Sequence, residues 1–179
     1  NTNVNASPNF TTTNDSAIVT TGSIETALNA GTSVLVKTTS SGTNAQSGDI
    51  TVSNTISKTA GGDATLTLEA DNSIFVNTSA NITSTSNKLH VVLNADKDNN
   101  NAGQITVTAA AITSNGGNIT LGGGVDPTND SAVGTDSTNK RGVYLNNGDL
   151  IAGSGNISIR GIGWTNAGTS HTSGLYINN

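Results

Sequence analysis

The sequence predicts an all-β protein folded as a parallel β-helix, in which short strands stack in successive turns of the chain. A phrase of five residues is repeated along the chain. It consists of glycine, a polar residue, an apolar residue, Thr or Ser, and an aliphatic residue, in that order. Each copy alternates apolar and polar residues, the period-two pattern of a half-buried strand. The chain offers no helical segment of ten residues, so strand–helix–strand crossovers are not expected.

The repeated phrase begins at glycines spread over most of the chain. Its copies are Gly48-Asp49-Ile50-Thr51-Val52, Gly103-Gln104-Ile105-Thr106-Val107, Gly117-Asn118-Ile119-Thr120-Leu121, Gly155-Asn156-Ile157-Ser158-Ile159 and the degenerate Gly62-Asp63-Ala64-Thr65-Leu66. A longer segment, Gly142-Val143-Tyr144-Leu145-Asn146-Asn147, returns as Gly174-Leu175-Tyr176-Ile177-Asn178-Asn179. Self-similarity of this kind indicates stacked structural units. We expect the side chains of Ile50, Leu66, Ile105, Ile119 and Ile157 to point inside.

The first part of the chain divides into an irregular lead-in and a short helix. Residues 1–16 are polar, contain Pro8 and lack alternation, so we expect an irregular lead-in, with the repeat segment covering 17–179. Residues 23–31 predict one helical turn, with Ser23 as N-cap and Gly31 in the left-handed position after its end. Ile24, Ala27 and Leu28 share its apolar face.

Strands follow at short intervals, separated by Gly, Asn, Asp and Ser clusters that favour turns. The expected strands are Val34–Val36, Ile50–Val52, Ala64–Glu69, Ser73–Val76, Leu89–Leu93, Ile105–Thr108, Ile119–Leu121, Val143–Leu145, Ile157–Ile159 and Leu175–Ile177. Two longer polar segments, Asp96–Ala102 and Gly122–Lys140, interrupt this rhythm, and we expect them to protrude as loops.

An antiparallel sandwich is the alternative all-β fold. Sandwiches bury aromatic residues where their sheets meet, and this chain has five aromatic residues. The narrow core of a β-helix is filled by stacked Val, Ile, Leu and Ala, which this chain supplies. Dense alternation of Val, Ile and Thr also favours an ordered structure over disorder.

The composition restricts the classes of partner and location. A net charge of −5 and a pI near 4.6 argue against a nucleic-acid partner, which requires a basic surface. The chain has no cysteine, so disulfides cannot stabilise it. Absence of cysteine is a mild indication of a long chain exported unfolded, and thus of a secreted or bacterial cell-surface location.

Several stretches resemble the filamentous haemagglutinin family, the large adhesins that bacteria export by two-partner secretion. The residues that carry the resemblance are Ser23–Gly31 with Val34-Leu35-Val36, then Gly48–Val52, Thr59–Leu68, Leu89–Asp96 and Ser114–Gly124. The resemblance implies a right-handed parallel β-helix, surface exposure or release, adhesion, and an outer-membrane secretion partner acting on the parent chain. The secretion domain of that family carries an Asn-Pro-Asn-Gly-type motif, where this chain has only Ser7-Pro8-Asn9-Phe10. We therefore expect an internal piece of a longer exoprotein.

Carboxylates raise the alternative of a polysaccharide-active β-helix enzyme, a lyase or hydrolase, which needs acids gathered on neighbouring turns. Most acids here stand singly in turn positions, and Asp49 and Asp63 occupy the same slot of the repeat. The segment that starts at Asp96 resembles a calcium loop but lacks the glycine at position six and the terminal Glu. His90 and His171 form no pair, which argues against zinc. We therefore predict no catalytic residue, no metal and no cofactor.

Three aromatic residues are candidates for stacking on sugar rings: Trp164, Tyr144 and Tyr176. The two tyrosines occupy equivalent places in the repeated six-residue segment, which predicts that they point to the same side. The alternative is that both are packing residues. Trp164 follows Gly161-Ile162-Gly163 and opens a polar segment, which makes it the stronger candidate.

The sequence thus favours a non-enzymatic structural and adhesive segment of a large secreted bacterial surface adhesin. Its expected partners are a host or bacterial surface glycan or protein receptor, with end-to-end self-association as a further possibility. A carbohydrate-binding module of the biofilm matrix is the third alternative.

Overall fold

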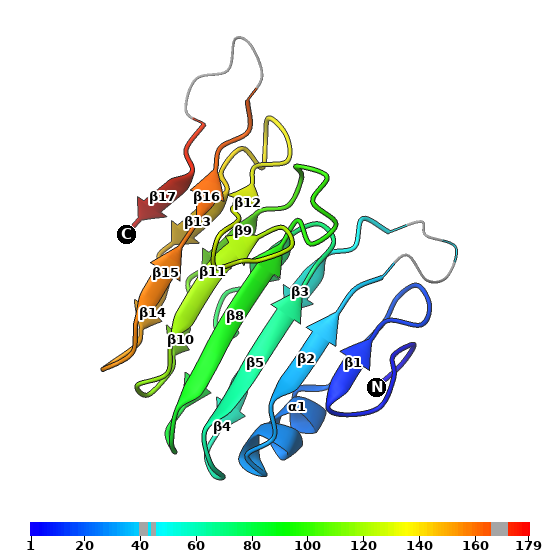
Figure 1. Ribbon diagram of the computed structural model, residues 1–179, viewed down its shortest axis with the longest axis vertical. Coiled ribbons are helices and arrows are strands. Elements are labelled where there is room, and N and C mark those ends of the chain that lie inside the picture. The colour runs from blue at the N-terminus through cyan, green and yellow to red at the C-terminus, as the bar shows by residue number, and fades with distance from the viewer. Residues whose placement is uncertain (40–42, 44–45, 166–171) are drawn as a thin grey trace.

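The computed structural model describes residues 1–39, 43, 46–165 and 172–179 (Figure 1). In this part of the chain the fold is all-β with parallel sheets and one short helix, as the sequence predicts. Every pairing between its named strands is parallel, which excludes the antiparallel sandwich. No helix of the described residues is long enough and apolar enough to cross a bilayer.

Three larger sheets and one small sheet contain all the named strands. The six-stranded sheet runs β1 (Asn9–Thr11), β2 (Val34–Lys37), β5 (Ala64–Glu69), β8 (Leu89–Ala95), β11 (Ile119–Gly123) and β15 (Ile157–Ile159). The five-stranded sheet runs β3 (Ile50–Val52), β6 (Ile74–Val76), β9 (Ile105–Thr108), β13 (Val143–Asn146) and β17 (Leu175–Asn178). The four-stranded sheet runs β4 (Ile56–Lys58), β7 (Ile82–Ser84), β10 (Ala111–Thr113) and β14 (Asp149–Ile151). The two-stranded sheet pairs β12 (Ala132–Val133) with β16 (Gly161–Ile162).

The chain visits the three larger sheets in a fixed order. From β3 onward it enters the five-stranded, then the four-stranded, then the six-stranded sheet, and this order repeats up to β15. We call one such passage a round. In Figure 1 the strands of the six-stranded sheet lie side by side, from β1 near the N-terminus to β15 near the opposite end. Residues far apart in sequence are thus neighbours across adjacent rounds.

The core consists of aliphatic side chains stacked in register from round to round. Leu66, Val91 and Ile119 are partners across β5, β8 and β11, and all three are fully buried. Ile74 and Ile105 form the matching buried pair in the five-stranded sheet. Burying a Leu or Ile side chain contributes about 1.5–3 kcal/mol, so each column of such residues holds adjacent rounds together.

Helix α1 (Thr21–Asn29) packs beside β4 at the N-terminal end of the stack. It begins two residues before the predicted N-cap Ser23, and Thr20 takes the N-cap position without a side-chain hydrogen bond. Its C-terminal end follows the prediction, because Gly31 has a φ of +74° and the N–H of Thr32 donates to the carbonyl of Ala27. The predicted apolar face of Ile24, Ala27 and Leu28 is buried.

Residues 1–16, expected to be an irregular lead-in, contain one strand of the six-stranded sheet. Strand β1 lies there, pairs in parallel with β2 and buries Phe10 completely. Val4 and Thr12 form an antiparallel bridge within the same segment. The three residues of β1 are too few for alternation to reveal them, and the apolar Phe10 is what anchors the strand.

Two glycines of the repeated phrase, Gly117 and Gly155, allow adjacent rounds to approach closely. A Cβ atom at Gly117 would overlap the carbonyl oxygen of Leu89, and one at Gly155 would overlap the carbonyl oxygen of Gly117. Both positions need glycine because any side chain would meet the backbone of the preceding round.

The predicted loops contain more regular structure than the sequence suggests. Asp96 begins the Asp96–Ala102 segment but is itself buried, at 1% exposure. The Gly122–Lys140 segment includes the buried end of β11 at Gly122 and Gly123 and the whole of β12. The expectation of a continuous loop over 122–140 is therefore wrong. The sequence pattern does not reveal Gly122 and Gly123 as strand residues, because glycine has no side chain that could show an alternation of apolar and polar positions.

The last round is the least buried. Leu66, Ile105 and Ile119 lie inside as predicted and Ile50 is half-buried, whereas Ile157 is 45% exposed. Ile157 is the register partner of the fully buried Ile119, but no strand of the described residues pairs with the other edge of β15. The predicted burial of Ile157 is thus corrected, because a core position needs a following layer to cover it.

Candidate functional site

An aromatic row crosses the outer face of the five-stranded sheet. Thr51, Phe75, Thr106, Tyr144 and Tyr176 are register partners on β3, β6, β9, β13 and β17. In β6, β9 and β13 these residues alternate with buried aliphatic neighbours, so their side chains point outward. Adjacent strands lie about 4.8 Å apart, so the row is a continuous strip on the surface.

Arg141 lies over both tyrosines at the C-terminal end of this row. Its guanidinium carbon is 4.4 Å from the ring centroid of Tyr144 and 4.2 Å from that of Tyr176. The two ring centroids are 5.5 Å apart, with an interplanar angle of 53°. Both distances fall within the range of cation–π attraction. The predicted tyrosine pair therefore shares one side, and it holds a cation against its rings.

The charge of Arg141 has no ionic partner in the described part of the chain. Lys97 and Glu69 form the one ion pair found there, at 3.6 Å. The Nε atom of Arg141 is buried and makes no hydrogen bond, and the Oγ1 atom of Thr106 is in the same condition. A buried donor without an acceptor costs free energy. The guanidinium of Arg141 is therefore held by its ring contacts, while its Nε–H makes no hydrogen bond.

Two asparagines extend the same face. Asn146 and Asn178 follow Tyr144 and Tyr176 by two residues, so they lie on the same side of the sheet. The side-chain amide of Asn178 donates to Oδ1 of Asn146 at 3.0 Å. One amide nitrogen, on Asn146, and one carbonyl oxygen, on Asn178, are then left to face solvent or a ligand.

Trp164 lies near this cluster through its backbone. Its N–H donates to the carbonyl of Lys140 at 3.0 Å, directly before Arg141 in the chain. The side chain is half-buried, and no ring contact joins it to a tyrosine within the described residues. The structure therefore brings Tyr144 and Tyr176 together and places Trp164 at the margin of their group.

The acids that the sequence analysis considered for catalysis have structural hydrogen-bond partners. Oδ1 of Asp49 accepts the side-chain amide of Asn72 at 2.7 Å and the N–H of Ser73 at 2.9 Å. Oδ1 of Asp63 accepts the N–H of Lys88 at 2.9 Å. Both carboxylates accept a backbone N–H directly before a strand of the next round. This position of the repeat therefore links adjacent rounds, in addition to its role in the turn.

The loop acids Asp126 and Asp136 accept hydrogen bonds from their own loops. The hydroxyl and the N–H of Thr128, with the amide of Asn129, hold the pKa of Asp126 below its ordinary value. The N–H groups of Asn139 and Thr138 lower the pKa of Asp136 in the same way. These carboxylates stay ionised and are committed to turn geometry.

The calcium-like segment and the histidines gather no ligand cluster. Burial raises the pKa of Asp96, and its Oδ1 accepts the N–H of Ala102 at 3.3 Å within its own loop. Nδ1 of His90 accepts the N–H of Asn118 at 3.0 Å, and His171 lies outside the described residues. Within the described ranges, no three His, Cys, Asp or Glu side chains come together in a way that could hold a metal ion.

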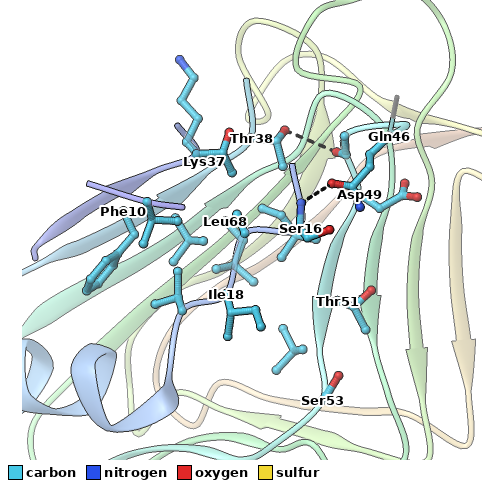
Figure 2. Close-up of a pocket in the computed structure, with 18 of the residues that line it drawn as sticks. Phe10, Ser16, Ile18, Lys37, Thr38, Gln46, Asp49, Thr51, Ser53 and Leu68 are labelled. Carbon is cyan, nitrogen blue, oxygen red and sulfur yellow. Dashed lines mark hydrogen bonds between the residues drawn. The ribbon is translucent and has the colours of Figure 1, made fainter. Parts of the chain in front are cut away.

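A cavity of about 670 Å³ lies at the N-terminal end of the stack, between residues 12–20, α1 and β3 (Figure 2). Its apolar walls include Phe10, Ile24 and Leu68, which belong to the core. Polar residues such as Thr51 and Ser53 also border it. The volume is that of a small-ligand pocket.

The charged groups of this cavity are already engaged or turned away. The carboxylate of Asp15 accepts a hydrogen bond from the hydroxyl of Thr43. The carboxylate of Asp49 accepts the hydrogen bonds from Asn72 and Ser73 described above. Figure 2 shows the Lys37 side chain extending away from the other labelled residues. Without a converging polar group to orient a ligand, the cavity is the uncovered end of the core.

Comparison of the chain with protein-family models, curated proteins and solved structures finds no match. Function is therefore inferred from the residues of this chain alone. Sequence reasoning missed Arg141, Phe75 and the Asn146–Asn178 pair at the aromatic face. The one available signal was the repeated segment Gly142–Asn147, which predicts the tyrosine and asparagine rows together, whereas the placement of Arg141 depends on the register of two strands.

Proposed function

We propose that this chain is a non-enzymatic, adhesive segment of a large secreted bacterial surface adhesin, folded as a right-handed parallel β-helix. The fixed order in which the chain visits three parallel sheets supports the β-helix, since each round then equals one turn of a coil. Right-handed crossovers are the rule for parallel strands. The resemblance of residues 20–125 to the filamentous haemagglutinin family supports the surface location.

The observation that carries the adhesive role is the aromatic row with Arg141 at its end. Aromatic rings on a flat outer sheet face offer stacking surfaces for sugar rings, and the neighbouring asparagine amides offer hydrogen bonds to hydroxyls. Tyr176 is 39% exposed, so part of this residue faces solvent beside the Arg141 guanidinium. The proposed partner is a glycan on a host cell, on another bacterium or in a biofilm matrix.

The proposed mechanism is geometric. Stacked rounds hold the outer face in a fixed position, and the backbone hydrogen bonds between parallel strands resist separation of adjacent rounds because many bonds bear force together. An outer-membrane secretion partner would act on the parent chain, and end-to-end association of segments would extend the assembly.

A glycan-binding measurement tests the proposal. The purified chain is applied to an array of immobilised bacterial and host glycans, with the Tyr144→Ala, Tyr176→Ala and Trp164→Ala variants beside it. We expect binding that falls at least tenfold with either tyrosine variant. Thr83→Ala, on the outer face of the four-stranded sheet, is the control and should bind as the unmodified chain does.

Two results would contradict the proposal. Absence of binding to every glycan would remove the adhesive role at this face. Release of new reducing ends from any polysaccharide by the purified chain, abolished by a single carboxylate substitution, would favour the enzyme alternative.

A further inference from the structure

The guanidinium of Arg141 is a fixed cation with no anion of the protein beside it. Two rings contact it at 4.4 and 4.2 Å, and no carboxylate of the described residues lies within ion-pair distance. Because Nε is buried, the donors that remain for another acceptor are those of the two terminal guanidinium nitrogens. Arginine matches a carboxylate especially well, because two parallel N–H donors meet two oxygens.

We propose that this face binds an acidic sugar, with Arg141 receiving the sugar carboxylate; the inference rests on the proposed function. The chain has a net charge of −5, so a general attraction of anions is not expected. Selection of an acidic ligand must therefore come from a local positive group, and Arg141 supplies one at this face.

The remaining groups of the face fit the rest of a sugar. The rings of Tyr144 and Tyr176 offer C–H stacking surface and two hydroxyls beside the guanidinium. Asn146 and Asn178 lie about 6.6 Å further along the strands, two residues at roughly 3.3 Å each. Their free amide nitrogen and free carbonyl oxygen form one donor and one acceptor for adjacent sugar hydroxyls.

An acidic peptide is the competing occupant, because its side-chain carboxylates would also meet Arg141. The tyrosine faces and the asparagine pair favour the sugar. A peptide would instead be expected to pair its backbone with the open edge of β17, whereas Arg141 and the two rings meet on the outer face beside that edge.

The test measures binding of the full chain to oligogalacturonates, hyaluronan oligomers and sialylated oligosaccharides, each beside its methyl-esterified counterpart. Esterification removes the charge and keeps the sugar. We expect at least one acidic probe to bind, with at least a tenfold loss on esterification. Arg141→Gln should bring binding of the acid down to that of the ester, and Arg141→Lys should fall between them.

Arg160→Gln is the matched control, because Arg160 donates to the carbonyl of Thr128 away from the tyrosines. It should bind as the unmodified chain does. Circular dichroism and thermal unfolding of each variant verify that the fold is kept, and Arg141→Lys retains the cation over the rings if Arg141→Gln does not fold.

The outcomes separate the two proposals. Equal binding of acid and ester, lost with Tyr144→Ala but kept in Arg141→Gln, overturns the acidic-sugar inference and leaves the glycan-binding function standing. Absence of binding to every glycan, acidic or neutral, overturns both. Tighter binding of poly-glutamate than of any acidic sugar, with the same dependence on Arg141, overturns the sugar assignment in favour of a peptide.

Discussion

The carboxylate of Asp63 accepts the backbone N–H of Lys88 at 2.9 Å, linking two rounds 25 residues apart in sequence. The same link recurs where Oδ1 of Asn118 accepts the N–H of Asn156 at 3.0 Å. In both cases the acceptor precedes a strand of the six-stranded sheet and the donor precedes the next strand of that sheet. The polar residue after glycine is therefore an acceptor for the following round in these two copies and at Asp49, whereas Gln104 donates its side-chain amide to Asn139.

Replacing Asp63 should separate this acceptor role from its charge. Asp63→Ala removes the acceptor, and we expect the free energy of unfolding to fall by about 1–2 kcal/mol in urea titrations. Asp63→Asn keeps a carbonyl oxygen at the same place and should lose less, since Asn118 serves in the equivalent position. An equal loss in both variants would show that charge, and not the acceptor, is what matters.

Two glycines of the repeat region make a matched pair for testing close approach of the rounds. Gly117→Ala would place a Cβ against the carbonyl oxygen of Leu89, whereas a Cβ at Gly62 meets nothing within 4 Å. We expect Gly117→Ala to destabilise the protein by about 1–3 kcal/mol. Gly62→Ala should be neutral or stabilise it by about 0.4–1 kcal/mol. Thermal and urea unfolding measure both, and similar effects at the two sites would contradict the close-approach explanation.

Lys58 is a fully buried lysine that takes three carbonyl oxygens as partners. Its ammonium donates to Ala60 at 2.8 Å, to Gly61 at 3.4 Å, and to Ser86 in the next round. Lys58→Met keeps the length of the side chain but removes all three donations. The carbonyl oxygens of Gly61 and Ser86 keep a second donor, the amide of Asn87 and the hydroxyl of Ser84, whereas that of Ala60 loses its side-chain donor.

We expect Lys58→Met to reduce the free energy of unfolding by about 3 kcal/mol. Lys88→Met, at an exposed position, is the control and should change it by less than about 0.5 kcal/mol. Equal stability of the two variants in urea would mean that the carbonyl oxygens find water when the ammonium is gone.

The sequence predicts the long strands well and the four-stranded sheet not at all. The expected bounds Ala64–Glu69 and Ile105–Thr108 match β5 and β9, because alternation there extends over at least four residues. The repeated segment also predicts the pairing of Val143 with Leu175. Strands β4, β7, β10 and β14 have three residues each and contain no copy of the repeated phrase. Strands β3 and β15 are equally short, but the repeated phrase predicts them.

The candidate site was predictable only in part, for a related reason. The equivalence of Tyr144 and Tyr176 follows from the repeat, and the structure pairs them in register. The position of Arg141 over both rings depends on how the segment before β13 turns toward β17, which no local pattern encodes. Phe75 joins the row through β6, whose register with β9 is likewise set by the fold.

Asp96 predicts a distinct pH dependence of stability. Burial raises its pKa above the ordinary 3.8, so the folded chain binds a proton at this site more readily than the unfolded chain does. The contribution of such a group to stability is fully present below the unfolded pKa and is lost as pH rises through the folded pKa.

Asp96→Asn removes this charge, and its amide oxygen can still accept the N–H of Ala102. We expect the variant to be more stable than the unmodified chain at pH 7. The difference should shrink as pH falls through the raised pKa of folded Asp96 toward 3.8, and it should change little below that. Urea unfolding from pH 3 to 8 measures it. A difference independent of pH would show that Asp96 titrates alike in the folded and unfolded chains.

Ile119 and Ile157 are register partners with opposite exposure, and this contrast tests whether the last round is an open surface. Ile119 is fully buried, whereas Ile157, Leu175 and Ile177 are 45%, 42% and 54% exposed. Ile119→Thr removes apolar contacts and buries a hydroxyl, so it should reduce the free energy of unfolding by about 2–4 kcal/mol. Ile157→Thr should reduce it by less than about 1 kcal/mol, because this residue is already exposed.

An exposed apolar edge also favours self-association, because the ladder of its outer strands is unpaired. We expect the unmodified chain to associate at high concentration and the double variant Ile157→Lys with Ile177→Lys to associate less, since like charges at the edge repel a second copy. Sedimentation of both proteins over a concentration series measures this. A strictly monomeric unmodified chain would contradict the end-to-end association proposed above, while the stability contrast between Ile119 and Ile157 would stand independently of that result.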